Sequence, residues 1–141
     1  MNLIAFVLFA LFALMPAATL VVNTGRAIAT NLIGAIAGTA PKYVAWGTGA
    51  GTAGATDTTL FTEASEARTA CVASQVTTTT TNDTLQMVGT ITVAGAGKTI
   101  TNVALFDQLA VGGNMYVKSD FTGLALNVGD SIAWTIKITY S

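Results

Sequence analysis

The clearest periodic signal in this chain is an alternation of apolar and polar side chains at residues 131–140. One face of this segment carries Ile132, Trp134, Ile136, Ile138 and Tyr140. The other face carries Ser, Ala, Thr and Lys side chains. A period of two residues is typical of a strand with one buried face. We therefore expect the side chains from Ile132 to Ile138 to face a core.

Six further segments show shorter or weaker patterns that also predict strands. They are residues 20–22, 42–46, 68–76, 84–93, 99–106 and 115–119. Most are rich in β-branched and aromatic residues, as strands usually are. The threonine run at 77–81 favours extended chain for the same reason. Residues 27–36 fit either a strand with a turn at Asn31 or one helical turn.

Two of these segments predict which side chains meet in the core. The apolar period-two positions of residues 84–93 are Leu85, Met87, Ile91 and Val93, and Gly89 is a gap or a bulge among them. Residues 99–106 divide into one face with Ile100, Asn102, Ala104 and Phe106, and another with Thr101, Val103 and Leu105. We expect the apolar face of residues 131–140 to pack with Leu85, Met87, Ile91, Val103 and Leu105.

Turn signals separate these segments about every ten residues, for example at residues 112–114 and 127–130. Short strands at this spacing predict an all-β protein, an antiparallel β-sandwich that is jelly-roll-like. The domain organisation that we expect is an apolar N-terminal arm or leader at residues 1–20 and a β-sandwich domain at residues 21–141.

The opening segment carries no charge before Arg26. As a signal peptide it lacks a positive n-region, and as a membrane anchor it is long enough to cross a bilayer. It also fits an arm that buries its apolar surface in a neighbouring subunit, or an over-extended reading frame whose natural start is Met15. We expect the assembly arm first, with the membrane anchor as the second interpretation.

The composition excludes several classes of chemistry. Only 9% of the 141 residues are charged, there is no histidine, and Cys71 is the single cysteine. The usual zinc sites and most nucleophile–base pairs are therefore unavailable. The six basic residues are scattered and the net charge is −1, which argues against binding to nucleic acid. We predict no enzyme activity, no catalytic, cofactor-binding or metal-binding residues, and no cofactor.

Two glycine-rich stretches resemble phosphate-binding motifs only superficially. Residues 49–54 fit G-x-G-x-x-G but show no sign of the helix that this fingerprint requires, so they predict a flexible loop between strands. Residues 95–99 end like a P-loop, but Thr92 stands where the first glycine is needed. We interpret them as a hairpin turn with a solvated Lys98.

The acidic and aromatic residues also admit two interpretations. Asp57, Glu63 and Glu66 lie close enough in sequence to bind a cation, but their spacing favours a solvated acidic connection. Asp107 and Asp130 are expected to be turn residues that accept hydrogen bonds from nearby backbone amides. The aromatic residues that could line a sugar site are better explained as core; they are Tyr43, Trp46 and Trp134.

The order of several segments resembles small virion proteins of tailed bacteriophages, variously described as cement, decoration, head-fibre or tail-fibre-like proteins. The segments are YVAWGTG, TDTTLFTEASEAR, TNDTLQMVGTITVAGAGKTITNVALFD, GGNMYVKSDF and LALNVGDSIAWTIKITYS. The group's recurrent turns correspond here to A-L-F-D at 104–107, G-G-N at 112–114 and G-D-S at 129–131. The resemblance covers about residues 21–141, and the apolar leader departs from it.

The resemblance implies a jelly-roll-like β-sandwich that forms a homo-oligomer, a dimer or trimer, and binds other virion subunits. We expect a capsid cement or decoration protein on the capsid surface, which bridges and stabilises subunits of the major capsid protein. The chain is short and has neither heptads nor fibrous repeats, so the head is preferred over the tail. A phage tail or fibre component is the alternative, and a membrane-anchored or pilin-like surface subunit is the second.

Overall fold

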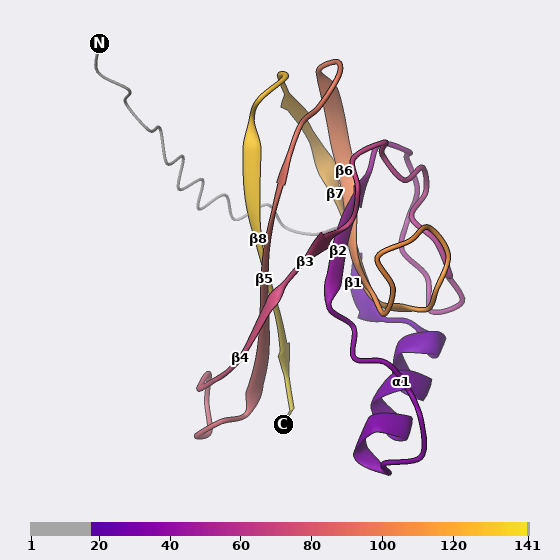
Figure 1. Cartoon of the computed structure of the whole chain (residues 1–141), viewed down its shortest axis with the longest axis vertical. Coiled ribbons are helices and arrows are strands. Elements are labelled where there is room, and N and C mark those ends of the chain that lie inside the picture. The colour runs from indigo at the N-terminus through magenta and orange to yellow at the C-terminus, as the bar shows by residue number, and fades with distance from the viewer. Residues whose placement is uncertain (1–17, 141) are drawn as a thin grey trace.

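The strands form two antiparallel sheets (Figure 1). The computed structural model describes residues 18–140. Its elements are β1 (Ala18–Val21), α1 (Asn23–Ile33), β2 (Tyr43–Gly47), β3 (Thr69–Ala70), β4 (Val72–Val76), β5 (Thr84–Thr92), β6 (Lys98–Phe106), β7 (Met115–Leu126) and β8 (Ser131–Thr139). One sheet has the order β1-β7-β6-β2-β3, and the other has the order β4-β5-β8. The prediction of a mainly β, antiparallel protein is confirmed, whereas the jelly-roll-like sandwich architecture stays a prediction.

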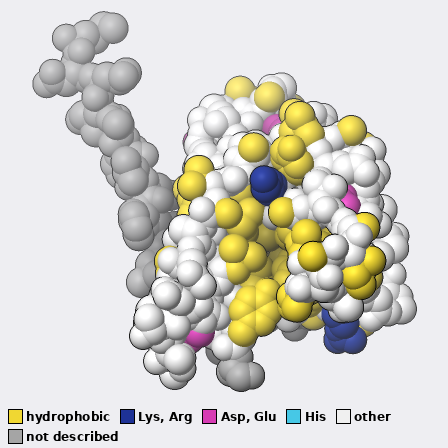
Figure 2. Space-filling view, turned by 60° about the horizontal axis from the view of Figure 1, so that its bottom comes forward, with side chains coloured by type: hydrophobic (Ala, Val, Ile, Leu, Met, Phe, Trp, Pro, Cys, Tyr) yellow, Lys and Arg dark blue, Asp and Glu magenta, His cyan; other side chains and the backbone are white. Residues whose placement is uncertain are grey.

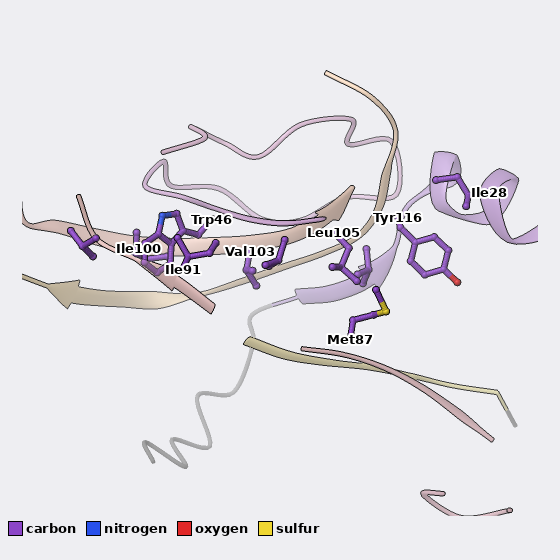
Figure 3. Packing of buried hydrophobic residues seen from close by; sticks show 11 residues of the cluster. Ile28, Trp46, Met87, Ile91, Ile100, Val103, Leu105 and Tyr116 are labelled. Carbon is purple, nitrogen blue, oxygen red and sulfur yellow. The ribbon is translucent and has the colours of Figure 1, made fainter. Parts of the chain in front are cut away.

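The larger apolar cluster draws its side chains from both sheets and from α1 (Figure 3). Its buried members are Ile28, Val44, Trp46, Met87, Ile91, Val93, Ile100, Val103, Leu105, Tyr116 and Val117. The side chains of Ile132, Trp134, Ile136 and Ile138 pack against this cluster from β8. In the register of β5 with β8, Leu85 lies opposite Ile138, Met87 opposite Ile136 and Ile91 opposite Ile132. The core that the alternation predicts is therefore confirmed.

The five-stranded sheet is buried on both faces. A second cluster on its other face consists of Val22, Ala45, Leu60, Ala104, Phe106 and Met115. Leu60 belongs to the connection between β2 and β3, which covers this face in Figure 1. Strands buried on both faces have little polar alternation, which explains why β6 is apolar on both sides.

One predicted face of β6 is wrong at its first residue. Ile100 belongs to the cluster of Val103 and Leu105, not to that of Ala104 and Phe106. The register of β6 with β7 shifts between Ile100 and Asn102. Over these two residues of β6 the partner strand advances four, from Leu124 to Asp120, so the ladder is irregular here and the strict alternation of faces is interrupted.

The ambiguous segment at residues 27–36 is helical up to Ile33, and its helix begins earlier than expected, at Asn23. Gly25 allows α1 to approach β7, because a Cβ at this position would clash with the Tyr116 carbonyl oxygen. The Thr24 hydroxyl donates to the Met115 carbonyl at 2.7 Å. A glycine inside a helix lowers its intrinsic stability, and the contact with β7 stabilises α1 in spite of Gly25.

The predicted strand at residues 68–76 is divided between the two sheets. β3 pairs with β2 and β4 pairs with β5, and Cys71 lies between them. A Cβ at Gly89 would lie 2.8 Å from the Cys71 sulfur and 2.8 Å from Val44 Cγ1. Gly89 keeps the regular register with Trp134, so it is a gap that admits these side chains and not a bulge.

The predicted conformation of residues 77–81 and the predicted end of the strand at residues 115–119 need correction. The threonine run at 77–81 forms a bend and turn, because both carboxylate oxygens of Asp83 accept backbone N–H bonds from Thr78, Thr79 and Thr80 at 2.8 Å. These bonds hold the Asp83 pKa far below its ordinary value.

β7 continues to Leu126 beyond the predicted residues 115–119, and the predicted strand at 20–22 is observed as β1. Residues 1–17 of the predicted arm lie outside the described residues.

Candidate functional site

The three acidic residues of the β2–β3 connection each bind a different basic residue. Asp57 pairs with Lys118 at 2.8 Å, Glu63 pairs with Arg68 at 2.7 Å, and Glu66 pairs with Lys98. Within residues 18–140, no group of three His, Cys, Asp or Glu side chains is placed to hold a metal ion. The interpretation of a solvated acidic connection is wrong, since the side chain of Glu66 is only 4% exposed and that of Glu63 17%.

The Glu66 carboxylate links the two sheets, because it accepts hydrogen bonds from three donors. Its Oε1 accepts the Lys98 ammonium and, at 3.0 Å, the backbone N–H of Ala94, and its Oε2 accepts the Trp46 indole N–H at 3.0 Å. Burial raises the pKa of Glu66, but these hydrogen bonds outweigh it and hold the pKa at about 2. The carboxylate is therefore ionised and fully engaged, which suits a structural role better than proton transfer.

The Glu66 pair also corrects the interpretation of residues 95–99. The preceding strand, β5, lies in the three-stranded sheet, while β6 lies in the five-stranded sheet. The segment therefore crosses between the sheets and is not a hairpin turn. The Lys98 side chain is 15% exposed and bound to Glu66, so it is not solvated as expected.

Arg68 holds the β6–β7 loop to the five-stranded sheet. Its Nε and Nη2 donate to the two carboxylate oxygens of Glu63, and its Nη1 donates to the carbonyls of Gln108 and Gly112 at 3.2 and 2.8 Å. The guanidinium lies 3.5 Å from the centroid of the Phe106 ring. All these groups lie within the fold, so Arg68 fixes a loop and is not presented to a ligand.

Lys118 has the same role on β7. Its side chain is 1% exposed, and its ammonium donates to Asp57 Oδ2 and to the Thr59 carbonyl at 3.0 Å, over the Phe61 ring. Burial raises the Asp57 pKa, but the bonds from Lys118 and from the Gly54 N–H lower it below its usual value. Sequence reasoning missed both buried cations, because the chain around them has no local pattern that marks burial.

The G-x-G-x-x-G stretch at residues 49–54 lies in a loop, as expected, but hydrogen bonds hold it in place. The Gly49 carbonyl accepts from Thr101 Oγ1 at 2.6 Å and from Asn102 Nδ2 at 3.1 Å. The Ala53 N–H donates to Asp120 Oδ1 at 3.1 Å. The loop opens no helix, so it lacks the converging N–H groups of a phosphate site.

The turn roles of Asp107 and Asp130 are confirmed. Asp107 Oδ1 accepts the Asn114 backbone N–H at 2.7 Å, and its Oδ2 accepts the Asn114 side-chain amide at 2.8 Å. Asp130 Oδ2 accepts the Asn127 N–H at 2.7 Å. Gly113 has a φ of 70°, and a Cβ there would lie 2.6 Å from Asp107 Oδ1. The recurrent A-L-F-D and G-G-N motifs therefore close one loop together.

Trp46 and Trp134 pack against each other and not as a platform for a sugar. Trp46 is 1% exposed and meets the half-buried Trp134 edge-to-face, with ring centroids 6.3 Å apart. The ring centroids of Phe121, on β7, and Trp134, on β8 of the other sheet, lie 5.7 Å apart. The interpretation of Trp46 and Trp134 as core residues is confirmed, because both pack within the larger cluster.

A shallow hollow lies between α1 and the β6–β7 loop, with a volume of about 260 Å³. Its lining residues are Thr24, Ala27, Ile28, Asn31, Gly38, Thr39, Asp107 and Asn114. The one ionisable group among them, Asp107, is bound to Asn114.

The single cysteine lies elsewhere, between β3 and β4. Burial raises the pKa of the Cys71 thiol, which disfavours the nucleophilic thiolate.

Several large apolar side chains of the described residues are exposed to solvent. Leu32, Ile33 and Ile36 at the end of α1 are 42%, 82% and 73% exposed, and the β6–β7 loop exposes Leu109 and Val111 by 55% and 84%. β1, β3, β4 and β8 are the outer strands of the two sheets. Such surfaces can bind other protein surfaces or add strands.

Among the helices of residues 18–140, none combines the length and the apolar character needed to cross a membrane. Comparison with protein-family models, with curated proteins and with solved structures gives no match to this chain.

Proposed function

We propose that this protein is a structural subunit of a tailed-phage virion, a capsid cement or decoration protein that bridges subunits of the major capsid protein. The observation that carries the proposal is the division of its side chains between interior and surface. The buried charges Glu66, Arg68 and Lys118 bind partners within the fold, whereas large apolar residues such as Ile33 and Val111 face outward. A chain built to bind protein neighbours has this distribution.

The turn motifs support a phage origin for this structural role. The A-L-F-D and G-G-N segments close the Asp107–Asn114 loop, and G-D-S closes the turn before β8. These are the features in which the sequence resembles small phage virion proteins. The proposal includes a jelly-roll-like sandwich and a dimer or trimer of the chain.

The mechanism is additive burial at subunit contacts. Each copy that binds two neighbouring shell subunits contributes its binding free energy only to the intact shell. Burial of apolar side chains such as those of Leu32, Ile33 and Ile36 contributes about 25 cal/mol per Å² of gross free energy. Repeated over many copies, this raises the free energy needed to open the shell under internal DNA pressure.

Counting copies tests this function. Quantitative mass spectrometry of purified particles is expected to find the protein in hundreds of copies, and particles without it are expected to assemble but to rupture at a lower temperature. A count of a few dozen or fewer, with impaired adsorption and unchanged head stability, contradicts the cement role and favours a tail or fibre component. Peptides from residues 1–14 in the same data decide between Met1 and Met15 as the natural start.

A further inference from the structure

The strands that contribute to the apolar core are buried to different degrees. Trp46, Ile91 and Ile100 pack closely together (Figure 3), and each is at most 2% exposed. Along β8, by contrast, the inward side chains are all only partly buried; they are Ile132, Trp134, Ile136 and Ile138. Tyr140, which follows the strand, is 55% exposed. The inner face of the three-stranded sheet is therefore incompletely covered along β8.

An apolar groove lies at the end of the molecule where β8 ends. Figure 2 shows hydrophobic side chains gathered in a hollow at the end where α1 and the last residues of β8 lie. The larger cluster includes Ile28 and Tyr116 from α1 and β7, and Leu85, Ile136 and Ile138 from β5 and β8. Tyr140 follows β8 directly. The Tyr116 and Tyr140 hydroxyls lie 3.3 Å apart, so β7 and the end of β8 meet here. None of these six side chains is charged at neutral pH.

The chain itself contains a segment whose chemistry matches this groove. Residues 1–17 carry no charged side chain and consist almost entirely of Leu, Phe, Ala, Val, Ile and Met. An extended chain of this length spans about 55 Å, whereas the extended residues from Ile136 to Tyr140 span about 17 Å. The segment is therefore long enough to cover the groove of another copy.

The direction of β1 favours the groove of another copy, because the segment would have to turn back along β1 to reach the groove of its own chain. Val21 pairs with Val117, beside Tyr116 of the groove, and Ala18 pairs with Asp120, farther along β7. β1 thus runs toward the groove of its own chain. The chain therefore enters β1 at the end of the strand that points away from that groove.

We propose that residues 1–17 of one copy occupy the apolar groove of a neighbouring copy and so join the copies into the assembly. The proposal deepens the assembly role proposed above by naming a second copy of this chain as the partner. Its test uses the purified chain in solution, whereas copy counting uses virions, so each can fail without the other.

Disulfide trapping between two variants tests this contact. In a full-length Cys71→Ala background, one variant carries Leu8→Cys or Phe9→Cys, two adjacent positions that sample different sides of the segment. The other variant carries Tyr140→Cys at the groove. The matched control carries Val128→Cys, which is 58% exposed and lies in the turn before β8, at the opposite end of that strand. The pairs are unfolded, mixed, refolded together and oxidised.

We expect the dimer with Tyr140→Cys to exceed the dimer with Val128→Cys by about fivefold or more for at least one leader position. Equal yields at the two sites overturn the proposal. A single chain with Leu8→Cys and Tyr140→Cys that closes its own disulfide and stays monomeric overturns it in favour of its own segment. Partition of the full-length chain into phosphatidylcholine vesicles without the Tyr140 cross-link overturns it in favour of a membrane anchor.

Discussion

Replacing Glu66 by Gln tests whether the buried carboxylate stabilises the contact between the two sheets. The folded-state pKa of about 2 lies well below the ordinary value of 4.5. At about 1.4 kcal/mol for each pKa unit, this difference corresponds to about 3 kcal/mol of stability. The Glu66 side chain is 4% exposed, but Lys98 is 15% exposed, so solvent screening reduces the expected loss to about 2–3 kcal/mol. The amide of the Glu66→Gln variant would also direct an N–H toward a donor, either Trp46 or Lys98.

The pH dependence gives the sharper measurement. A carboxyl whose pKa is lower in the folded state contributes its stability above the unfolded-state pKa and loses it as the pH falls. The difference between wild type and Glu66→Gln is therefore expected to be full at neutral pH and to shrink between pH 4.5 and about 2. Urea unfolding followed by tryptophan fluorescence across this range measures it.

The control for this experiment is Lys137→Gln, which removes one charge at an exposed position on β8. It is expected to change the free energy of unfolding by less than about 0.5 kcal/mol. A loss in Glu66→Gln no larger than this, or one that does not vary with pH, refutes the assignment of Glu66 as a stabilising carboxylate.

Two further substitutions test the other structural assignments. Arg68→Met is expected to cost about 3 kcal/mol, because it leaves Glu63 buried without its cation, and to accelerate hydrogen exchange in the β6–β7 loop; unchanged exchange would show that another contact holds the loop. Trp46→Ala is expected to cost about 3–5 kcal/mol. At its half-buried position Trp134→Ala is expected to cost about 2–3 kcal/mol, and equal losses in urea unfolding would contradict the difference in burial.

Local sequence was sufficient where a strand has one buried face. The alternation at residues 131–140 predicts β8 and its inward side chains, and the period of residues 84–93 predicts β5. Both strands lie in the three-stranded sheet, with one face toward the core. Side chains of a strand alternate between faces, so a one-sided environment is recorded directly in the sequence.

The chemistry that the sequence excludes depends likewise on composition alone. A chain without histidine and with one cysteine lacks the ligands of common zinc sites whatever its fold. The turn roles of Asp107 and Asp130 were also predictable. Each carboxylate accepts a backbone N–H from a residue near in sequence, and such bonds depend on local chain geometry.

Only the tertiary structure determines how strands are assigned to sheets and which residues distant in the chain form ion pairs. Residues 68–76 form two strands because the chain changes sheets at Cys71, and residues 95–99 cross between sheets where the local signal indicates a hairpin. The helix α1 lies against β7 because Gly25 admits the backbone of that strand. The periodicity of a segment records which of its side chains are buried, but not which strand or charge covers them. The partners of Glu66 and Lys118 lie 32 and 61 residues away, so their pairing arises only when the folded chain brings them together.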